Sequence, residues 1–117
     1  MKLFKSIAMV AMLCAVLVAE AHVGLVGSTP KDGSRGAAPK TVELRFTEDA
    51  YLVSVTLQGT AGPATPLAIP SGGASTVFSV VLPALVPGEY VVSWRVESDD
   101  GHATSGKVAF TVVGGKP

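Results

Sequence analysis

Apolar and polar residues alternate in several short segments of this 117-residue chain, and this alternation constrains the fold more than any other feature. The side chains of a β-strand point to opposite faces in turn, so a period of two is typical of strands with one buried face. Most of the 13 Gly and 8 Pro lie between these segments and favour turns over helices. The pattern therefore predicts an all-β domain with short strands. The alternating segments are Thr41 to Phe46, Tyr51 to Leu57, Glu89 to Val96 and Gly106 to Val113.

Each alternating segment has an apolar face that we expect to pack in the core. Two further short strands are predicted at His22 to Gly27 and Thr76 to Leu82, whereas Gly33 to Pro39 reads as a loop. Gln58 to Ala74 is rich in Gly and Pro and offers only Leu67 to Ile69 as a short edge strand. Six or seven strands without a helix predict a two-sheet sandwich or a Greek-key barrel. The predicted core faces are Val42, Leu44 and Phe46; Tyr51, Val53, Val55 and Leu57; Tyr90, Val92, Trp94 and Val96; and Val108, Phe110 and Val112.

The first 21 residues have the pattern of a secretory signal peptide. Lys2 and Lys5 form a basic head, an uncharged apolar run follows from Ser6 to Ala19, and Ala19-Glu20-Ala21 places small residues at a cleavage site. The apolar run is shorter than the roughly 20 residues of a membrane-spanning helix, which disfavours an uncleaved anchor. A lipoprotein anchored at Cys14 is a further alternative, disfavoured because the bulky Leu13 precedes it. We expect an exported domain comprising residues 22–117.

Cleavage after Ala21 would leave a mature chain of 96 residues without any sulfur. Cys14 and all three methionines precede the cleavage site. Their loss excludes a disulfide framework, thiolate zinc, blue copper, an iron–sulfur cluster and a cysteine nucleophile. The mature chain carries seven Lys and Arg against eight Asp and Glu. This balance argues against nucleic-acid binding, which normally needs a basic excess.

The two histidines of the mature chain lie where they could bind a metal together. His22 would be the new amino terminus, and its α-amine and ring Nδ1 can close a six-membered chelate ring around Cu(II). Asp100 and His102 are two residues apart, so in an extended segment they project to the same side. The three residues would supply three nitrogens and one oxygen, a tetragonal Cu(II) set. The alternatives are a histidine left by chance at the terminus and a solvated Asp-Asp-Gly turn.

Several stretches of the mature chain match the motifs of one family. They are Ser28 to Gly33 (STPKDG), Glu43 to Glu48 (ELRFTE), Pro87 to Val96 (PGEYVVSWRV), Ser98 to Gly106 (SDDGHATSG) and the closing strand Val108 to Val112. His22 directly after the signal site completes the pattern. Over nearly its full mature length the chain resembles the CopC/PcoC family, small periplasmic copper-binding proteins of bacterial copper resistance.

The resemblance implies an immunoglobulin-like, seven-stranded Greek-key β-barrel with one Cu(II) per chain. The implied ligands are the amine and ring of His22, Asp100 and the ring of His102. It also suggests Glu48 as an axial or outer-shell group, although a solvent-facing carboxylate at a strand end explains Glu48 equally well. The best-known members carry a methionine-rich loop that binds Cu(I), whereas Gln58 to Ala74 contains no methionine here. We therefore expect no Cu(I) methionine site.

The resemblance favours a monomeric, non-enzymatic copper carrier or scavenger of copper resistance or homeostasis. Such a protein would hand copper to a chaperone or to a membrane transporter of the CopD type. One alternative is a copper redox enzyme with a histidine brace, although 96 residues leave little room for a substrate platform. The other is a metal-free immunoglobulin-like interaction module, which would require His22 and His102 to be coincidental.

Overall fold

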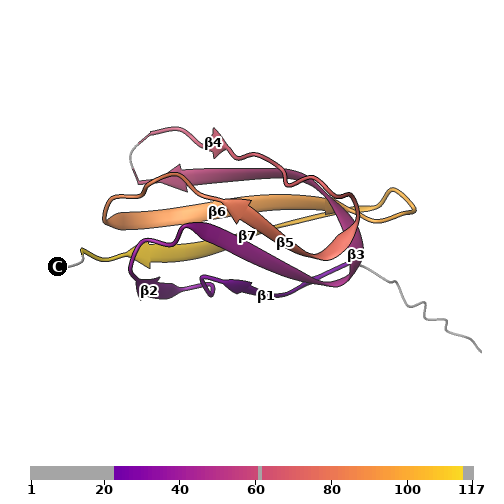
Figure 1. Cartoon of the computed structure of the whole chain (residues 1–117), viewed down its shortest axis with the longest axis horizontal. Coiled ribbons are helices and arrows are strands. Elements are labelled where there is room, and N and C mark those ends of the chain that lie inside the picture. Colours follow the sequence, from indigo (N-terminus) through magenta and orange to yellow (C-terminus); the bar gives the residue numbers. More distant parts are fainter. Residues whose placement is uncertain (1–22, 61, 115–117) are drawn as a thin grey trace, which may run out of the picture.

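Seven β-strands arranged around one core make up the part of the chain that the computed structural model describes, residues 23–60 and 62–114. Figure 1 shows the strands running roughly along the long axis of a curled, two-layered domain. Helices are absent from these ranges, and hence so is any helix that could span a membrane. The predicted all-β, seven-stranded fold is confirmed. The strands are β1 (Leu25–Thr29), β2 (Ser34–Gly36), β3 (Thr41–Gly59), β4 (Thr65–Pro66), β5 (Ser75–Val81), β6 (Gly88–Glu97) and β7 (Ala103–Val112).

The 19-residue strand β3 belongs to both layers and joins them. Its first half pairs antiparallel with β1 and β5, and its second half pairs antiparallel with β4 and β6. The pairing with β5 is irregular between Arg45 and Ala50, where the strand passes from one layer to the other. β6 and β7 form an antiparallel hairpin, and β2 adds to β7 in parallel.

Three predictions of where strands and loops lie were wrong. The predicted strands Thr41 to Phe46 and Tyr51 to Leu57 are one strand, because the residues between them lack Gly and Pro and form a bend rather than a turn. The predicted loop Gly33 to Pro39 contains β2, whose three residues are ordered by pairing with β7. The edge strand expected at Leu67 to Ile69 lies earlier, at Thr65–Pro66, although the Leu67 amide still donates to the Val55 carbonyl at 2.9 Å.

The predicted core faces are buried in the first half of β3 and in β7. The predicted core face of β6 is also buried, except for Tyr90, which is half-buried. In the second half of β3 the prediction was wrong for Tyr51 and Val53, which are 47% and 42% exposed, while Leu52 is buried. The pairing with β6 shifts register between Leu52 and Ser54. Because side chains alternate, a shift of one residue exchanges the inner and outer faces. Val55 and Leu57, beyond the shift, are buried as expected.

Trp94 packs in the aromatic core, as predicted, with 5% of its surface exposed. Its ring meets Phe46 edge-on at a centroid distance of 5.1 Å, and Phe46 meets Phe78 at 6.1 Å. Trp94 pairs across the hairpin with Gly106. A Cβ built at Gly106 would overlap the indole, with Cε2 only 2.9 Å away. The tryptophan therefore occupies the space that a side chain at position 106 would need.

Candidate metal centre

The turn between β6 and β7 positions Asp100 and His102. Gly101 adopts a φ of +88°, a conformation that side-chain-bearing residues rarely take. The Gly101 amide donates to the Ser98 carbonyl, and the Ser98 amide donates to the His102 carbonyl, both at 2.9 Å. These bonds close the turn at one end of the barrel, where it projects beyond the strands (Figure 1).

The side chains of Asp100 and His102 lie against each other on this turn. His102 Nδ1 is 3.2 Å from Asp100 Oδ2, and the His102 amide donates to Asp100 Oδ1 at 3.2 Å. The Ser98 hydroxyl also donates to Asp100 Oδ1. The imidazole is 76% exposed and the carboxylate 66% exposed. The pair is therefore held together by the turn but is open to solvent.

The hydrogen bonds that hold Asp100 also favour its charged form. The Ser98 hydroxyl, followed by the His102 amide, lowers the pKa of the Asp100 carboxyl below its ordinary value. Desolvation opposes these two hydrogen bonds, and the positive charge that His102 can carry adds a lesser effect in the lowering direction. A carboxylate that stays ionised at lower pH remains available to bind a cation.

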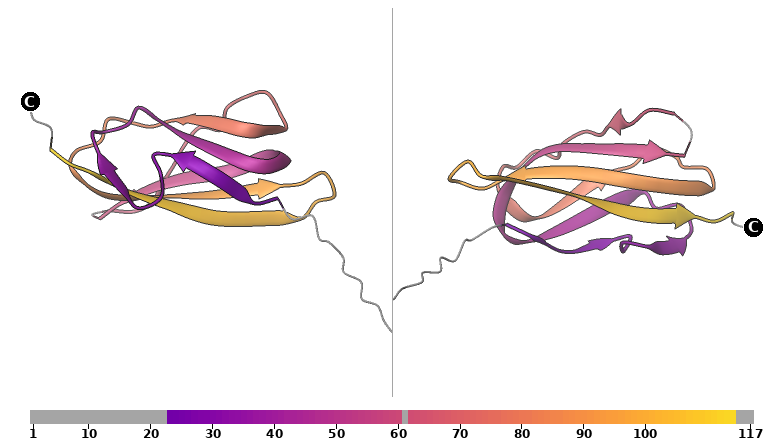
Figure 2. Two further views of the ribbon diagram at one scale, coloured as in Figure 1. Left: turned by 90° about the horizontal axis from the view of Figure 1, so that it is seen from below. Right: turned by 180° about the vertical axis from the view of Figure 1, so that it is seen from behind.

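The third predicted ligand, His22, lies outside the described residues, as do the predicted signal segment and its cleavage site. Its bonded neighbour Val23 is buried, with 3% of its surface exposed. Gly24 pairs with Thr47 of β3, near the bend of that strand. Figures 1 and 2 show, from three directions, that this first described segment and the β6–β7 turn lie at the same end of the barrel.

The pairing of strands accounts for this shared location. Beyond the bend, Tyr51 of β3 pairs with Glu97, and Glu97 pairs with Ala103, the residue after His102. The structure therefore brings the point of attachment of His22 to the end of the barrel that bears Asp100 and His102. The assignment of His22 as a ligand stays a prediction.

Glu48, the fourth candidate, is exposed at the bend of β3 and forms no hydrogen bond or ion pair with Asp100 or His102. Within residues 23–60 and 62–114, no three His, Cys, Asp or Glu side chains form a group that could hold a metal ion. Among the residues that the structure describes, the candidate metal donors are thus Asp100 and His102. The role of Glu48 as an axial or outer-shell group stays a prediction. This part of the chain also contains no Cys or Met, so it offers no sulfur ligand for Cu(I).

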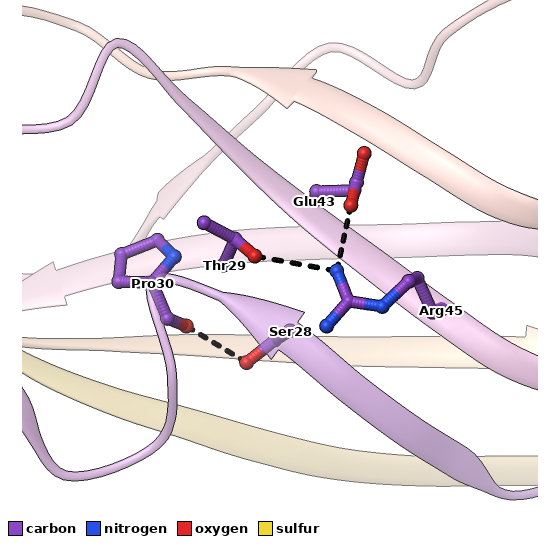
Figure 3. Close-up of polar contacts among 5 residues, drawn as sticks. All are labelled: Ser28, Thr29, Pro30, Glu43 and Arg45. Carbon is purple, nitrogen blue, oxygen red and sulfur yellow. Dashed lines mark hydrogen bonds and ion pairs between the residues drawn. The ribbon is translucent and has the colours of Figure 1, made fainter.

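Polar contacts on the outer face fasten the other end of β1 to β3 (Figure 3). Arg45 Nη1 donates to Glu43 Oε1 at 2.6 Å and to Thr29 Oγ1 at 3.2 Å. The Ser28 hydroxyl donates to the Pro30 carbonyl at 2.8 Å. A cavity of about 370 Å³ lies beside Glu43 and contains none of the predicted metal ligands. This region therefore supports β1 rather than forming part of the candidate metal centre.

The fold and the exposed pair define a small immunoglobulin-like β-barrel with ligand-type side chains on an end turn. The family model described as the CopC domain matches residues 25–113. A copper resistance protein C of Pseudomonas syringae pv. tomato is 41% identical over 105 residues, covering 81% of this chain and 83% of the relative. The chain belongs to the CopC family, which confirms the resemblance found in the sequence.

Two solved structures agree with this assignment. The crystal structure of CopC from Methylosinus trichosporium OB3b has a TM-score of 0.70 at 30% identity, covering 82% of this chain and 98% of the other. PcoC of Escherichia coli, described as a methionine-rich copper resistance protein, has a TM-score of 0.61 at 30% identity, covering 79% and 99%. The described part of the present chain has the fold of PcoC without its methionines.

Proposed function

We propose that the mature chain is a periplasmic Cu(II) carrier or scavenger that binds one ion and passes it to a membrane transporter or chaperone. Membership of a copper resistance family supports copper as the metal. The observation that carries the proposal is the Asp100–His102 pair, with nitrogen and oxygen donors 3.2 Å apart at the end where the described chain begins. The α-amine and ring of His22 would complete a tetragonal set.

The exposure of the pair supports transport rather than catalysis. Both side chains are more than half exposed, so an incoming ligand from an acceptor protein can reach the metal. Nitrogen and oxygen donors without sulfur favour Cu(II) over Cu(I), which argues against a second, reduced site. Oxygen consumption in the presence of a reductant would instead support the redox-enzyme alternative.

The proposal is tested on untagged protein purified from the periplasm. Its amino-terminal residue and intact mass are determined, and it is titrated with Cu(II) under electron paramagnetic resonance. We expect a His22 start and one type-2 Cu(II) with nitrogen hyperfine structure. A different start, or no stoichiometric copper, would contradict the proposal and favour the metal-free module.

Replacing His102 by alanine is expected to weaken Cu(II) binding by about ten- to a hundredfold, since even outer-shell changes cost this much in metal sites. Asp100→Asn should cost less, because an amide oxygen can still coordinate weakly. Asp99→Asn is the matched control, since Asp99 is a neighbouring exposed carboxylate on the same turn, and it should change affinity less than twofold. Competition titrations measure all three, and equal affinities for His102→Ala and the unchanged protein would exclude His102 as a ligand.

Cu(II) affinity is expected to fall between about pH 7.5 and pH 5, because imidazoles and α-amines ordinarily take up protons in this range. The pKa of Asp100 is lowered, chiefly by the Ser98 hydroxyl, so its carboxylate stays ionised throughout. The fall in Cu(II) affinity should therefore come from the nitrogen donors. Equal affinities at the two pH values would contradict this ligand set.

In the metal-free protein, the folding stability contributed by the Asp100 contacts is present above the ordinary carboxyl pKa and is lost as the pH falls through the lowered pKa.

A further inference from the structure

Thr47 makes a two-point contact with the first residues that the structure describes. The Thr47 amide donates to the Gly24 carbonyl at 2.9 Å, and the Gly24 amide donates to Thr47 Oγ1 at 3.0 Å. Thr47 thus satisfies both backbone groups of Gly24. Its hydroxyl accepts from the Gly24 amide, which in a regular ladder would donate to a backbone carbonyl of the partner strand. Gly24 is two residues from His22 in the sequence.

Val23 adds a second restraint next to this contact. Val23 has 3% of its surface exposed and belongs to the same core cluster as Phe46 and Trp94. A buried valine cannot leave the core without losing the free energy gained by burying its side chain. The segment that leads to His22 is therefore restrained by packing at Val23 and by hydrogen bonds at Gly24.

A bulge interrupts the pairing of β1 with β3 close to this segment. The register shifts between Leu25 and Gly27, so the pairs from Gly27 to Thr29 are separated from the pair of Leu25 with Phe46, which lies next to the contact of Gly24 with Thr47. At the far end of β1, Thr29 and Arg45 make their own contact. The Thr47 hydroxyl consequently acts on the amino-terminal side of the bulge, at the end of the short paired stretch that includes Leu25 and Phe46.

We propose that Thr47 is a positioning residue that holds the amino end of the mature chain beside the Asp100–His102 pair and so raises Cu(II) affinity. This inference rests on the proposed function, since it requires His22 to be a ligand. A terminus that is ordered before the metal arrives loses less conformational freedom on binding. Thr47 itself need not touch the metal.

Thr47→Val tests the inference because it removes the hydroxyl acceptor while keeping the shape of the side chain. Losing one hydrogen bond of ordinary strength predicts a three- to tenfold weaker Cu(II) affinity. Thr29→Val is the matched control, because it removes an exposed hydroxyl acceptor at the other end of β1. We expect it to leave the affinity within twofold. Thr47→Ser restores the hydroxyl and should restore the affinity.

Two further measurements separate positioning from a general loss of stability. In the metal-free protein, hydrogen exchange of the Gly24 amide should become faster in Thr47→Val and stay unchanged in Thr29→Val. In a version with one alanine added before His22, Thr47→Val should cause no further loss of affinity, because the displaced terminus no longer binds the metal.

Each outcome bears on a different claim. If the unchanged protein binds Cu(II) and Thr47→Val binds it equally well, the positioning role is wrong and the proposed function stands. If Thr29→Val weakens binding as much as Thr47→Val, the effect is one of stability, and the positioning role is again wrong. If the unchanged protein with a free His22 amine binds no copper, both claims fall together.

Discussion

One alanine added before His22 is expected to lower Cu(II) affinity by more than about a hundredfold, the largest effect that we predict on binding. The change turns the α-amine into an amide and moves the new amine one residue away, so the six-membered chelate ring is lost. Because the extension breaks a chelate made by two donors, its cost should exceed the roughly ten- to hundredfold loss expected from removing the single ring of His102. Competition titration against a chelator of known affinity measures the effect, and electron paramagnetic resonance should show fewer coordinated nitrogens.

Two controls separate the amine from the added length. Acetylation of the His22 amine keeps the chain length and should weaken binding to a similar extent. An alanine added after Pro117 should leave the affinity unchanged. If the version extended before His22 binds Cu(II) as tightly as the unextended protein, the amine is not a ligand, and the Asp100–His102 pair must act with other groups.

Gly106→Ala is expected to destabilise the fold by about 1–3 kcal/mol, the cost typical of an overpacked core. A Cβ at this position would overlap Trp94, and the indole has little room to move because Phe46 packs edge-on against it at 5.1 Å. The ring must shift or the β6–β7 pairing must widen. Urea denaturation followed by the fluorescence of Trp94, the only tryptophan, measures the change in the free energy of unfolding.

Gly36→Ala is the matched control for this prediction. Gly36 also lies in a strand, but a Cβ added there would meet no atom within 4 Å. We expect the free energy of unfolding of Gly36→Ala to stay within about 0.5 kcal/mol of that of the unchanged protein. A Trp94→Phe replacement should recover part of the loss in the Gly106→Ala background, because the smaller ring leaves room for the methyl group. Since this replacement removes the fluorescent probe, its unfolding is followed by circular dichroism. A Gly106→Ala protein as stable as Gly36→Ala would show that the indole does not constrain this position.

The sequence alone determined the class of fold and much of the candidate centre. Alternation around Leu44, Val92 and Phe110 identified core faces that are buried in the structure, because the period of two is a local property of each strand. The spacing of Asp100 and His102 predicted that their side chains would lie together, and they are 3.2 Å apart. The motifs led to the family that the comparisons confirm.

Only the tertiary structure decided the features that depend on pairing between distant segments. The register shift after Leu52 turned Val53 outward, since a bulge changes which residues face the core and leaves no periodic signal. The contact of Thr47 with Gly24 joins residues 23 positions apart, and no motif or spacing in the sequence predicts it. The need for glycine at position 106 likewise arises from a ring on the neighbouring strand. Local patterns determine which residues prefer a strand and a buried face, whereas register, bulges and close approaches are decided by the partner that each strand meets.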